Sequence, residues 1–218
     1  MPKIIFIHIP KTGGLTLQGI AGGQYEKNRI YNTKGKNFQE DISEIIKLPT
    51  DKKNQLKYIG GHMSFGLHSY FPGQCQYITM LRDPIERTIS EYYFLKLWNK
   101  EKVPIIKFIK DNKVSLNDYI KASNLLNISN IQTKLISGFQ DTIFQKSSKK
   151  ITNRDLTVAK KNLASFQAFG LLEYFDLSMF LFRKKLNWKK NVFYDIKNKN
   201  LKEEKIWKLK QYSLLQQL

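Results

Sequence analysis

Short apolar runs alternate with amphipathic stretches along most of this chain. The first run, Lys3–Ile9, is rich in β-branched residues and stops at Pro10, which predicts a buried strand. Three later runs predict further strands: 57–62, Gln76–Leu81 and 167–173. Because helical stretches separate these runs, the pattern predicts an α/β fold with a central, mainly parallel sheet flanked by helices.

Helix starts are marked by capping residues and by proline. Asp83 precedes Pro84, Ser115 precedes a short amphipathic stretch, and Thr152 or Asn153 precedes a third. We expect a first helix at Leu15–Ile20 that stops at Gly22 and Gly23, and a second near Phe38–Leu48 within an otherwise loop-like stretch, 24–56. A third is expected after Pro84, with an apolar stripe made of Ile85, Ile89, Tyr92, Tyr93 and Leu97. Two more are expected, one that ends at Leu163 and one at 174–188. No linker or repeat divides the chain, so we expect a single domain over 1–218.

Composition narrows the class of protein. The 218 residues include 37 Lys and Arg against 18 Asp and Glu, a formal net charge of +19. This charge favours an anionic partner, although many of the lysines lie in Asn/Lys-rich stretches typical of solvated loops. Cys75 is the only cysteine, which excludes an internal disulfide. The first apolar stretch is short for a signal peptide, and no apolar run is long enough for a membrane span, so we expect a cytoplasmic protein without a membrane partner.

The loop after the first expected strand has the sequence PKTGGLT, from Pro10 to Thr16. Gly13 and Gly14 allow backbone amides to turn towards an oxyanion, and the start of the following helix adds partial positive charge. Lys11 adds a mobile cation. The Walker order, with glycines before the lysine, is absent, and no magnesium-binding carboxylate follows a matching strand. An ordinary strand–turn–helix corner remains the alternative.

A second candidate is the segment YITMLRDPIERTISEYYF at 77–94. Arg82 leaves a strand, and Ser90 follows two turns into the next helix, so both can converge on one phosphate. Asp83 and Glu86 are interpreted as a helix cap and a solvated or ion-paired group. A simple strand–helix unit with surface charges is the alternative for this segment.

Together, PKTGG and LRDPIERTISEYY resemble the sulfotransferases that use 3′-phosphoadenosine 5′-phosphosulfate (PAPS). The likeness is closest to the heparan sulfate 2-O-sulfotransferase group and its bacterial relatives. GGHMSFGLHSYF at 60–71, NIQTKLISG at 130–138 and the stretch 159–182 are similar to the same family, so the resemblance covers most of 3–188. It implies a P-loop-like sulfotransferase fold whose part after about Trp188 diverges, with Asn198 and Lys199 as candidates for a nucleotide-covering loop.

The resemblance implies sulfuryl transfer from PAPS to an acceptor hydroxyl, with a carbohydrate acceptor expected, anionic acceptors included, and with no metal. The residues it implies around the 5′-phosphosulfate are Lys11, Thr12, Gly13, Gly14, Leu15 and Thr16. It implies that Arg82 and Ser90 bind the 3′-phosphate and that Lys11 stabilises charge on the leaving oxygen. His62 matches the position of the catalytic base, and His8 the position of a substrate contact. Each histidine has a structural alternative, and His68 is expected to be structural or exposed.

The sequence differs from the pattern of this family at two places, and these differences concern the acceptor more than the donor. Gly60-Gly61-His62 stands where the glycan enzymes have His-Gly-His, and Leu15 replaces a hydroxyl residue. Three alternatives remain open: a P-loop-type kinase or nucleotide-binding protein, a basic nucleic-acid-binding protein without catalysis, and a family member that binds nucleotide without turnover. Aromatic residues fall on helical stripes (YYFLKLW, MFLF), which favours core packing over stacking on nucleic acid. The oligomeric state is left open.

Overall fold

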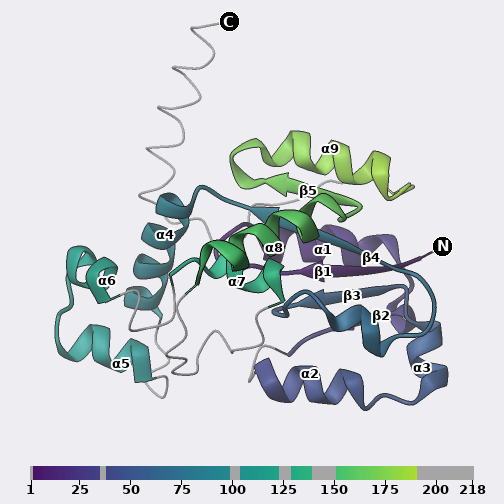
Figure 1. Ribbon diagram of the computed structural model, residues 1–218, viewed down its shortest axis with the longest axis horizontal. Helices are drawn as coiled ribbons and strands as arrows, with labels where there is room; N and C mark the ends of the chain where they lie inside the picture. The colour runs from purple at the N-terminus through teal and green to yellow at the C-terminus, as the bar shows by residue number, and fades with distance from the viewer. Residues whose placement is uncertain (1, 35–37, 99–103, 123–128, 139–150, 191–218) are drawn as a thin grey trace, which may run out of the picture.

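The computed structural model describes residues 2–34, 38–98, 104–122, 129–138 and 151–190 (Figure 1). Within them, a five-stranded sheet has the order β2-β3-β1-β4-β5, and every neighbouring pair of strands is parallel. The strands are β1 (Lys3–Ile7), β2 (Ile30–Asn32), β3 (Tyr58–Gly61), β4 (Cys75–Leu81) and β5 (Ala168–Leu171). The predicted α/β fold with a central parallel sheet is confirmed. Asn198 and Lys199 lie outside the described residues.

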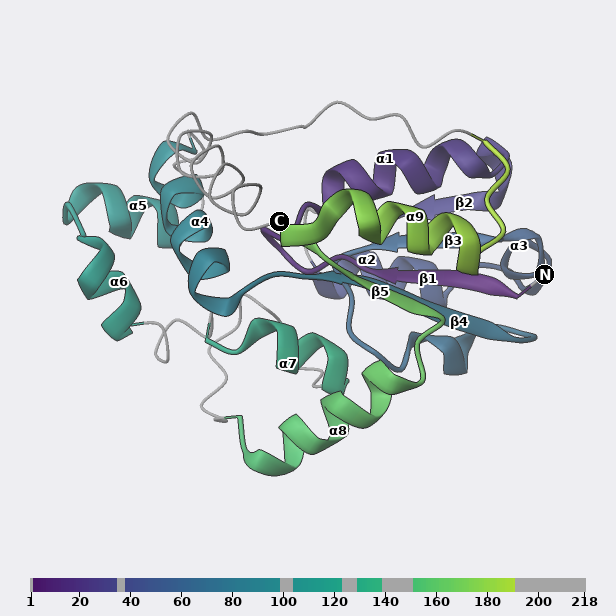
Figure 2. The same ribbon diagram turned by 90° about the horizontal axis from the view of Figure 1, so that it is seen from above.

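Helices cover both faces of this sheet. Alternate residues of β1 point to opposite faces, as in any strand. Ile5 and Ile7 join one apolar cluster, and Ile4 and Phe6 join another. The first cluster includes residues of α2 (Phe38–Ile46), α7 (Ile131–Ser137) and α8 (Asn153–Ala164), and the second includes residues of α1 (Gly14–Gln24) and α9 (Phe175–Lys185). Figure 2 shows α1 and α9 on the side of the sheet opposite α7 and α8.

A third cluster lies beyond the sheet, where α4 (Pro84–Leu97), α5 (Pro104–Asp111) and α6 (Leu116–Ala122) lie together (Figures 1 and 2). Its buried residues are Tyr92, Leu95, Ile106, Ile109 and Tyr119. The remaining described elements are α3 (Thr50–Gln55) and short 3₁₀ turns at Lys27–Arg29, Leu67–Tyr70 and Leu172–Tyr174. Among the helices of the described ranges, none combines the length and apolar character needed to cross a bilayer.

The expected helix caps are present. The Asp83 carboxylate accepts hydrogen bonds from the backbone N–H groups of Ile85 (2.9 Å) and Glu86 (3.0 Å) at the start of α4. The Ser115 hydroxyl accepts a bond from Asp118 N at the start of α6, and Thr152 forms a reciprocal capping box with Asp155 at the start of α8. Such caps satisfy amide donors that lack an intrahelical partner, which is why these residue types locate helix starts in a sequence.

Two boundaries differ from expectation at the amino-terminal end. β1 ends at Ile7, two residues early, because His8 and Ile9 already turn into the following loop. The expected stop of α1 at Gly22 and Gly23 is wrong, since the helix continues to Gln24. Burial of Leu17, Ile20 and Ala21 against the sheet stabilises the helix enough to include both glycines, each at a cost of about 1 kcal/mol.

Two further expectations are corrected. The stretch 24–56 contains β2 and α3 besides the expected helix α2, and β2 is only three residues long and flanked by polar residues. On α4, the predicted apolar stripe is wrong in part, because Ile85 and Leu97 are both 68% exposed. The buried side of α4 carries Arg87, Ser90, Glu91, Tyr92 and Leu95. Hydrophobic periodicity fails here because α4 lies beyond the end of the sheet and meets a polar loop.

Replacing Gly22 by alanine is expected to stabilise the protein by about 0.5–1 kcal/mol, because Gly22 is inside α1 and a Cβ added there meets no atom within 4 Å. Urea denaturation measures the change in the free energy of unfolding. Gly61→Ala is the matched control with the opposite sign. Gly61 has φ +146° and an added Cβ would lie 2.0 Å from Thr33 Oγ1. Destabilisation by Gly22→Ala would contradict the expectation.

Candidate active site

The chain leaves β1 through a tight loop and enters α1 at Gly13 and Gly14. Lys11 (φ 68°) and Gly13 (φ 76°) both have left-handed backbone conformations. The Thr12 side chain is fully buried, and its hydroxyl donates a 2.8 Å hydrogen bond to Ile9 O. Thr12 therefore closes the loop on itself. Because the cap residue is glycine, it brings no side-chain acceptor to the first amides of α1, and no acidic residue lies in the first turn. Such a helix start favours an anion.

The two glycines of this loop have different reasons to be glycine. Gly13 needs its left-handed φ, and a Cβ there would also lie 2.7 Å from Leu172 Cδ1. At Gly14 the reason is close approach, because a Cβ would lie 2.0 Å from His8 Cδ2. The imidazole of His8 thus lies directly against the start of α1. Leu15 and Thr16 follow in the first turn, where Leu15 is half exposed and Thr16 is buried.

His8 is 6% exposed, and its ring stacks on those of Phe6 (5.5 Å between centroids) and His62 (4.4 Å). Burial, with the nearby His62 as a smaller cause, lowers the pKa of His8 from 6.5 to about 3, while a hydrogen bond with Gln18 opposes the shift. His8 is therefore a neutral, packed imidazole at physiological pH. This position fits the core alternative for His8, and its contact with an acceptor stays a prediction.

His62 follows β3 and is half buried. Its Nδ1 lies 2.7 Å from His8 O. A carbonyl oxygen can only accept, so Nδ1 carries the proton and donates it, which leaves the lone pair on Nε2. His8 N in turn donates to Gly61 O at 2.9 Å, so the backbone of His8 bonds both residues at the end of β3. Burial lowers the pKa of His62, against opposing effects of the His8 carbonyl and of Asp41. A neutral imidazole with a defined tautomer is suited to accept a proton.

Arg82, at the end of β4, is buried next to the loop after β1. Its Nη1 donates to Lys11 O at 3.3 Å, and its Nη2 lies 3.9 Å from Glu86 Oε2. The bond to Lys11 O stabilises the left-handed conformation of a non-glycine residue, which is otherwise unfavourable. Arg82 and the glycine loop, 71 residues apart in sequence, are therefore brought together as expected from the two motifs.

Ser90 lies on the buried side of α4. The Lys11 ammonium lies over the ring of Phe94, 4.1 Å from its centroid, which is a cation–π distance. Ser90 and Phe94 are four residues apart and so are neighbours on one helix face. The Lys11 side chain therefore extends from the loop towards the part of α4 that carries Ser90. Phe94 was not among the predicted site residues, because an aromatic residue on an apolar stripe indicates core packing.

Two other residues that contact the site, Gln132 and Glu173, were also not predicted from the sequence. Gln132 on α7 bonds both backbone groups of Arg82, and Glu173 Oε1 accepts a 2.8 Å bond from Asp83 N. Their only signal was membership of stretches similar to the family. His68 is exposed and its Nδ1 lies 2.9 Å from the Tyr77 hydroxyl, in agreement with the expected structural or surface position. Within the described ranges, no three or more His, Cys, Asp and Glu side chains are grouped so as to hold a metal ion.

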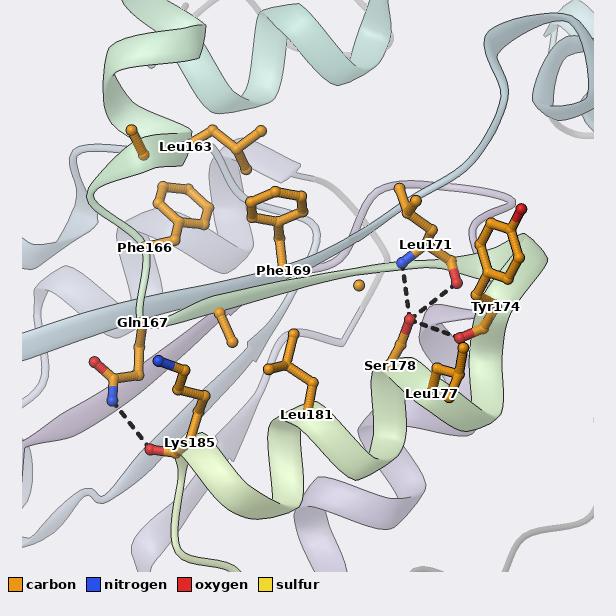
Figure 3. Close-up of a pocket in the computed structure, with 13 residues that line it drawn as sticks. Leu163, Phe166, Gln167, Phe169, Leu171, Tyr174, Leu177, Ser178, Leu181 and Lys185 are labelled. Atoms are coloured by element: carbon orange, nitrogen blue, oxygen red, sulfur yellow. Dashed lines mark hydrogen bonds between the residues drawn. The ribbon is translucent and has the colours of Figure 1, made fainter.

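An apolar groove of about 480 Å³ lies elsewhere, between β5 and α9 (Figure 3). Phe169, Leu171 and Tyr174 line it together with Leu177 and Leu181. None of the candidate site residues lines this groove. A site for an anionic donor needs amide and cationic groups, so the loop after β1 fits that purpose and the groove does not.

Comparisons with known proteins find a matching family and similar sequences. The model of the sulfotransferase family matches residues 1–172. Heparan sulfate 2-O-sulfotransferase 1 of Gallus gallus is 26% identical over 129 residues, 55% of this chain and 36% of that protein. The Mus musculus protein of the same name is 31% identical over 103 residues, 43% of this chain and 29% of that protein. The chain thus spans about a third of the length of these curated relatives.

A solved structure, mouse sulfotransferase SULT7A1 complexed with PAP, has a similar fold. The TM-score is 0.50 at 12% sequence identity, with 87% of this chain and 59% of that chain covered. At this identity the likeness concerns the fold alone.

Protein stability is expected to fall as the pH is lowered from 7.5 to 5.5. Unfolded His8 takes up a proton below its ordinary pKa of 6.5, whereas folded His8 does so only near 3, so the unfolded state binds more protons in this window. The free energy of unfolding then decreases by up to about 1.4 kcal/mol per pH unit for one such histidine. Urea denaturation at several pH values measures this slope. His8→Gln, which cannot titrate, is expected to have a smaller slope than the wild type, and equal slopes would refute the assignment.

Proposed function

The chain belongs to the sulfotransferase family, and on this basis we propose that it transfers a sulfuryl group from PAPS to a hydroxyl of a carbohydrate acceptor. The observation that carries the proposal is the meeting of three strand ends: the glycine loop after β1, His62 after β3 and Arg82 at the end of β4. The names of the relatives support it, since they are heparan sulfate 2-O-sulfotransferases, and the structural neighbour was solved with PAP.

The residues at these strand ends fit a donor with two anionic groups. The uncapped start of α1, with Gly13 in a left-handed conformation, is suited to the 5′-phosphosulfate. The Arg82 guanidinium, 71 residues away along the chain but bonded to Lys11 O, is suited to the 3′-phosphate, with the Ser90 hydroxyl as a second donor. Thr12 contributes through loop closure and its backbone, because its hydroxyl is already donated to Ile9 O.

Lys11 is proposed to stabilise the transition state. Sulfuryl transfer from PAPS leaves negative charge on the oxygen that bridged phosphorus and sulfur, and a nearby ammonium lowers the energy of that charge. The Lys11 side chain extends from the loop after β1 towards α4, and its ammonium lies 4.1 Å from the centroid of the Phe94 ring. The face of an aromatic ring attracts a cation, so Phe94 helps to orient the Lys11 side chain.

His62 is proposed as the base. In the balanced reaction, the acceptor hydroxyl forms the new O–S bond and its proton moves to His62 Nε2. The S–O bond to the donor phosphate breaks, and adenosine 3′,5′-bisphosphate leaves with the electron pair. The bond from His62 Nδ1 to His8 O keeps Nε2 unprotonated and fixes the ring orientation. In this scheme His8 supports catalysis through its carbonyl oxygen and through the stacking of its ring on His62.

A carbohydrate, including an anionic one, is the proposed acceptor. Both named relatives act, by their names, on heparan sulfate, and the formal charge of +19 suits a polyanionic chain. The kinase and nucleic-acid-binding alternatives are not favoured, because the family match extends over 1–172 and includes both segments proposed to bind phosphate.

The donor assignment predicts selectivity for a 3′-phosphate. Calorimetric titration is expected to give a dissociation constant for adenosine 3′,5′-bisphosphate at least about tenfold lower than for the 5′-monophosphate, because a hydrogen bond to a charged group contributes about 1.5–3 kcal/mol. Arg82→Lys is expected to reduce this ratio with little change for the monophosphate. Arg29→Lys, an exposed arginine that pairs with Glu26, is the matched control and should leave the ratio unchanged. Equal affinities for the two nucleotides in the wild type would sink the donor assignment.

The role of His62 predicts a specific kinetic defect. His62→Gln is expected to lower kcat by about 10²–10⁴-fold with nearly unchanged affinity for adenosine 3′,5′-bisphosphate, because a base acts on the acceptor proton. Transfer of radiolabelled sulfate to a panel of glycans measures the rate. In the wild type, kcat/KM should fall towards acid with a midpoint below 6.5, since burial lowers the pKa of His62. His68→Gln is the control with normal turnover. Retained turnover in His62→Gln removes it from this role.

A further inference from the structure

Arg82 has an unusual partner for its backbone. Arg82 N donates to Gln132 Oε1 at 3.0 Å, and Gln132 Nε2 donates to Arg82 O at 2.8 Å. The ladder between β4 and β5 ends at the preceding residue, Leu81, which pairs with Leu171. The ladder between β1 and β4 ends earlier, at Thr79, so Gln132 bonds the backbone of a residue that lies beyond both ladders. Two reciprocal hydrogen bonds to the backbone of one residue fix both its position and the orientation of its peptide groups.

Gln132 is itself on a firmly packed element. Ile131 and Leu135 of α7 are buried in the same apolar cluster as Ile5 and Ile7 of β1. Asn162 on α8 donates a 2.9 Å bond to Ile136 O. Because α7 packs on the sheet core and on α8, it holds the Gln132 side chain in place at little further entropic cost.

The same helix also supports the segment after His62. Phe65 N donates to Leu135 O at 2.8 Å, and a Cβ added at Gly138 would lie 3.0 Å from Phe65 O. α7 thus contacts the strand end that carries Arg82 and the loop that follows the proposed base. An element that reaches both is suited to set their spacing.

The guanidinium of Arg82 depends on its backbone for position. The side chain is buried, with Nη1 bonded to Lys11 O and Nη2 near Glu86. A buried arginine side chain has few alternative rotamers. A shift of the Arg82 backbone therefore moves the guanidinium group by a similar amount. Recognition of a phosphate by a planar fork is sensitive to such a shift, because both N–H groups must point at the oxygens.

We propose that Gln132 is a positioning residue that makes the donor site select a 3′-phosphate, acting through the backbone of Arg82. The proposal rests on the proposed function, in which Arg82 binds that phosphate. Gln132 itself contacts neither the donor nor the reacting atoms in this scheme. It determines where the guanidinium lies relative to Lys11 O and to the start of α1.

The test compares nucleotide selectivity in three variants by calorimetry, with melting temperatures recorded for each. Gln132→Met keeps the length of the side chain and removes both bonds. Gln132→Glu keeps an acceptor for Arg82 N and loses the donor to Arg82 O. This variant tests the proposal if Gln132→Met does not fold. Asn162→Ala is the matched control, because it removes a bond between a side-chain amide and the backbone of the same helix α7 without touching Arg82.

Both Gln132 variants are expected to lose about fivefold or more of the ratio between the affinities for adenosine 3′,5′-bisphosphate and the 5′-monophosphate, with the monophosphate affinity within about twofold of wild type. Asn162→Ala is expected to keep the wild-type ratio of affinities, even if its melting temperature falls as much as that of the Gln132 variants. If the wild type is selective and the Gln132 variants are equally selective, the inference is overturned and the proposed function stands. If the wild type itself does not distinguish the two nucleotides, both are overturned.

Discussion

The proposed site exists because β1 is hydrogen-bonded in parallel to β3 on one side and to β4 on the other. Ile7, the last residue of β1, is aligned with Gly61 and with Thr79, so the chain leaves all three strands at the same edge. From β1 the chain continues to β2 on one side of the sheet, and from β4 it continues to β5 on the other. A crevice at such a reversal is where ligands bind in open parallel sheets. A register shift of one residue would exchange the two faces of β1 and is opposed by burial on both sides.

Core packing and the proposed catalytic geometry share residues in this protein. His8 fills space between Phe6, His62 and the start of α1, and its bulk explains why position 14 is glycine. Its carbonyl also fixes the tautomer of His62. A buried neutral imidazole thus costs some stability in acid and provides a rigid support for the proposed base. The same principle applies to Gln132, whose side-chain amide bonds both backbone groups of Arg82, the first residue after β4.

The helix α4 shows how the site changes an ordinary pattern. Its buried side carries Ser90 and the ion pair between Arg87 and Glu91, whose atoms Nη2 and Oε2 lie 3.0 Å apart. Burial, with the nearby Glu91 as a further cause, raises the pKa of Tyr119 on α6, so its hydroxyl stays neutral beside this pair. Buried charges are tolerated when they are hydrogen-bonded to each other. α4 therefore combines these polar groups with Tyr92 and Leu95, which pack against α5 and α6, and it leaves Ile85 and Leu97 exposed.

The sequence alone determined the features that depend on local chemistry. Short apolar runs located four of the five described strands, and capping residues located the starts of α4, α6 and α8. The order of lysine and glycines in PKTGGLT indicated an anion loop. Tertiary structure decided what depends on distant partners: the inclusion of β2 in the sheet, the buried position of His8, the buried side of α4, and the bonds from Gln132 to Arg82. The physical reason is that caps and turns involve residues three or four apart, whereas burial and ladder-end hydrogen bonds join residues about fifty apart, and no local pattern records them.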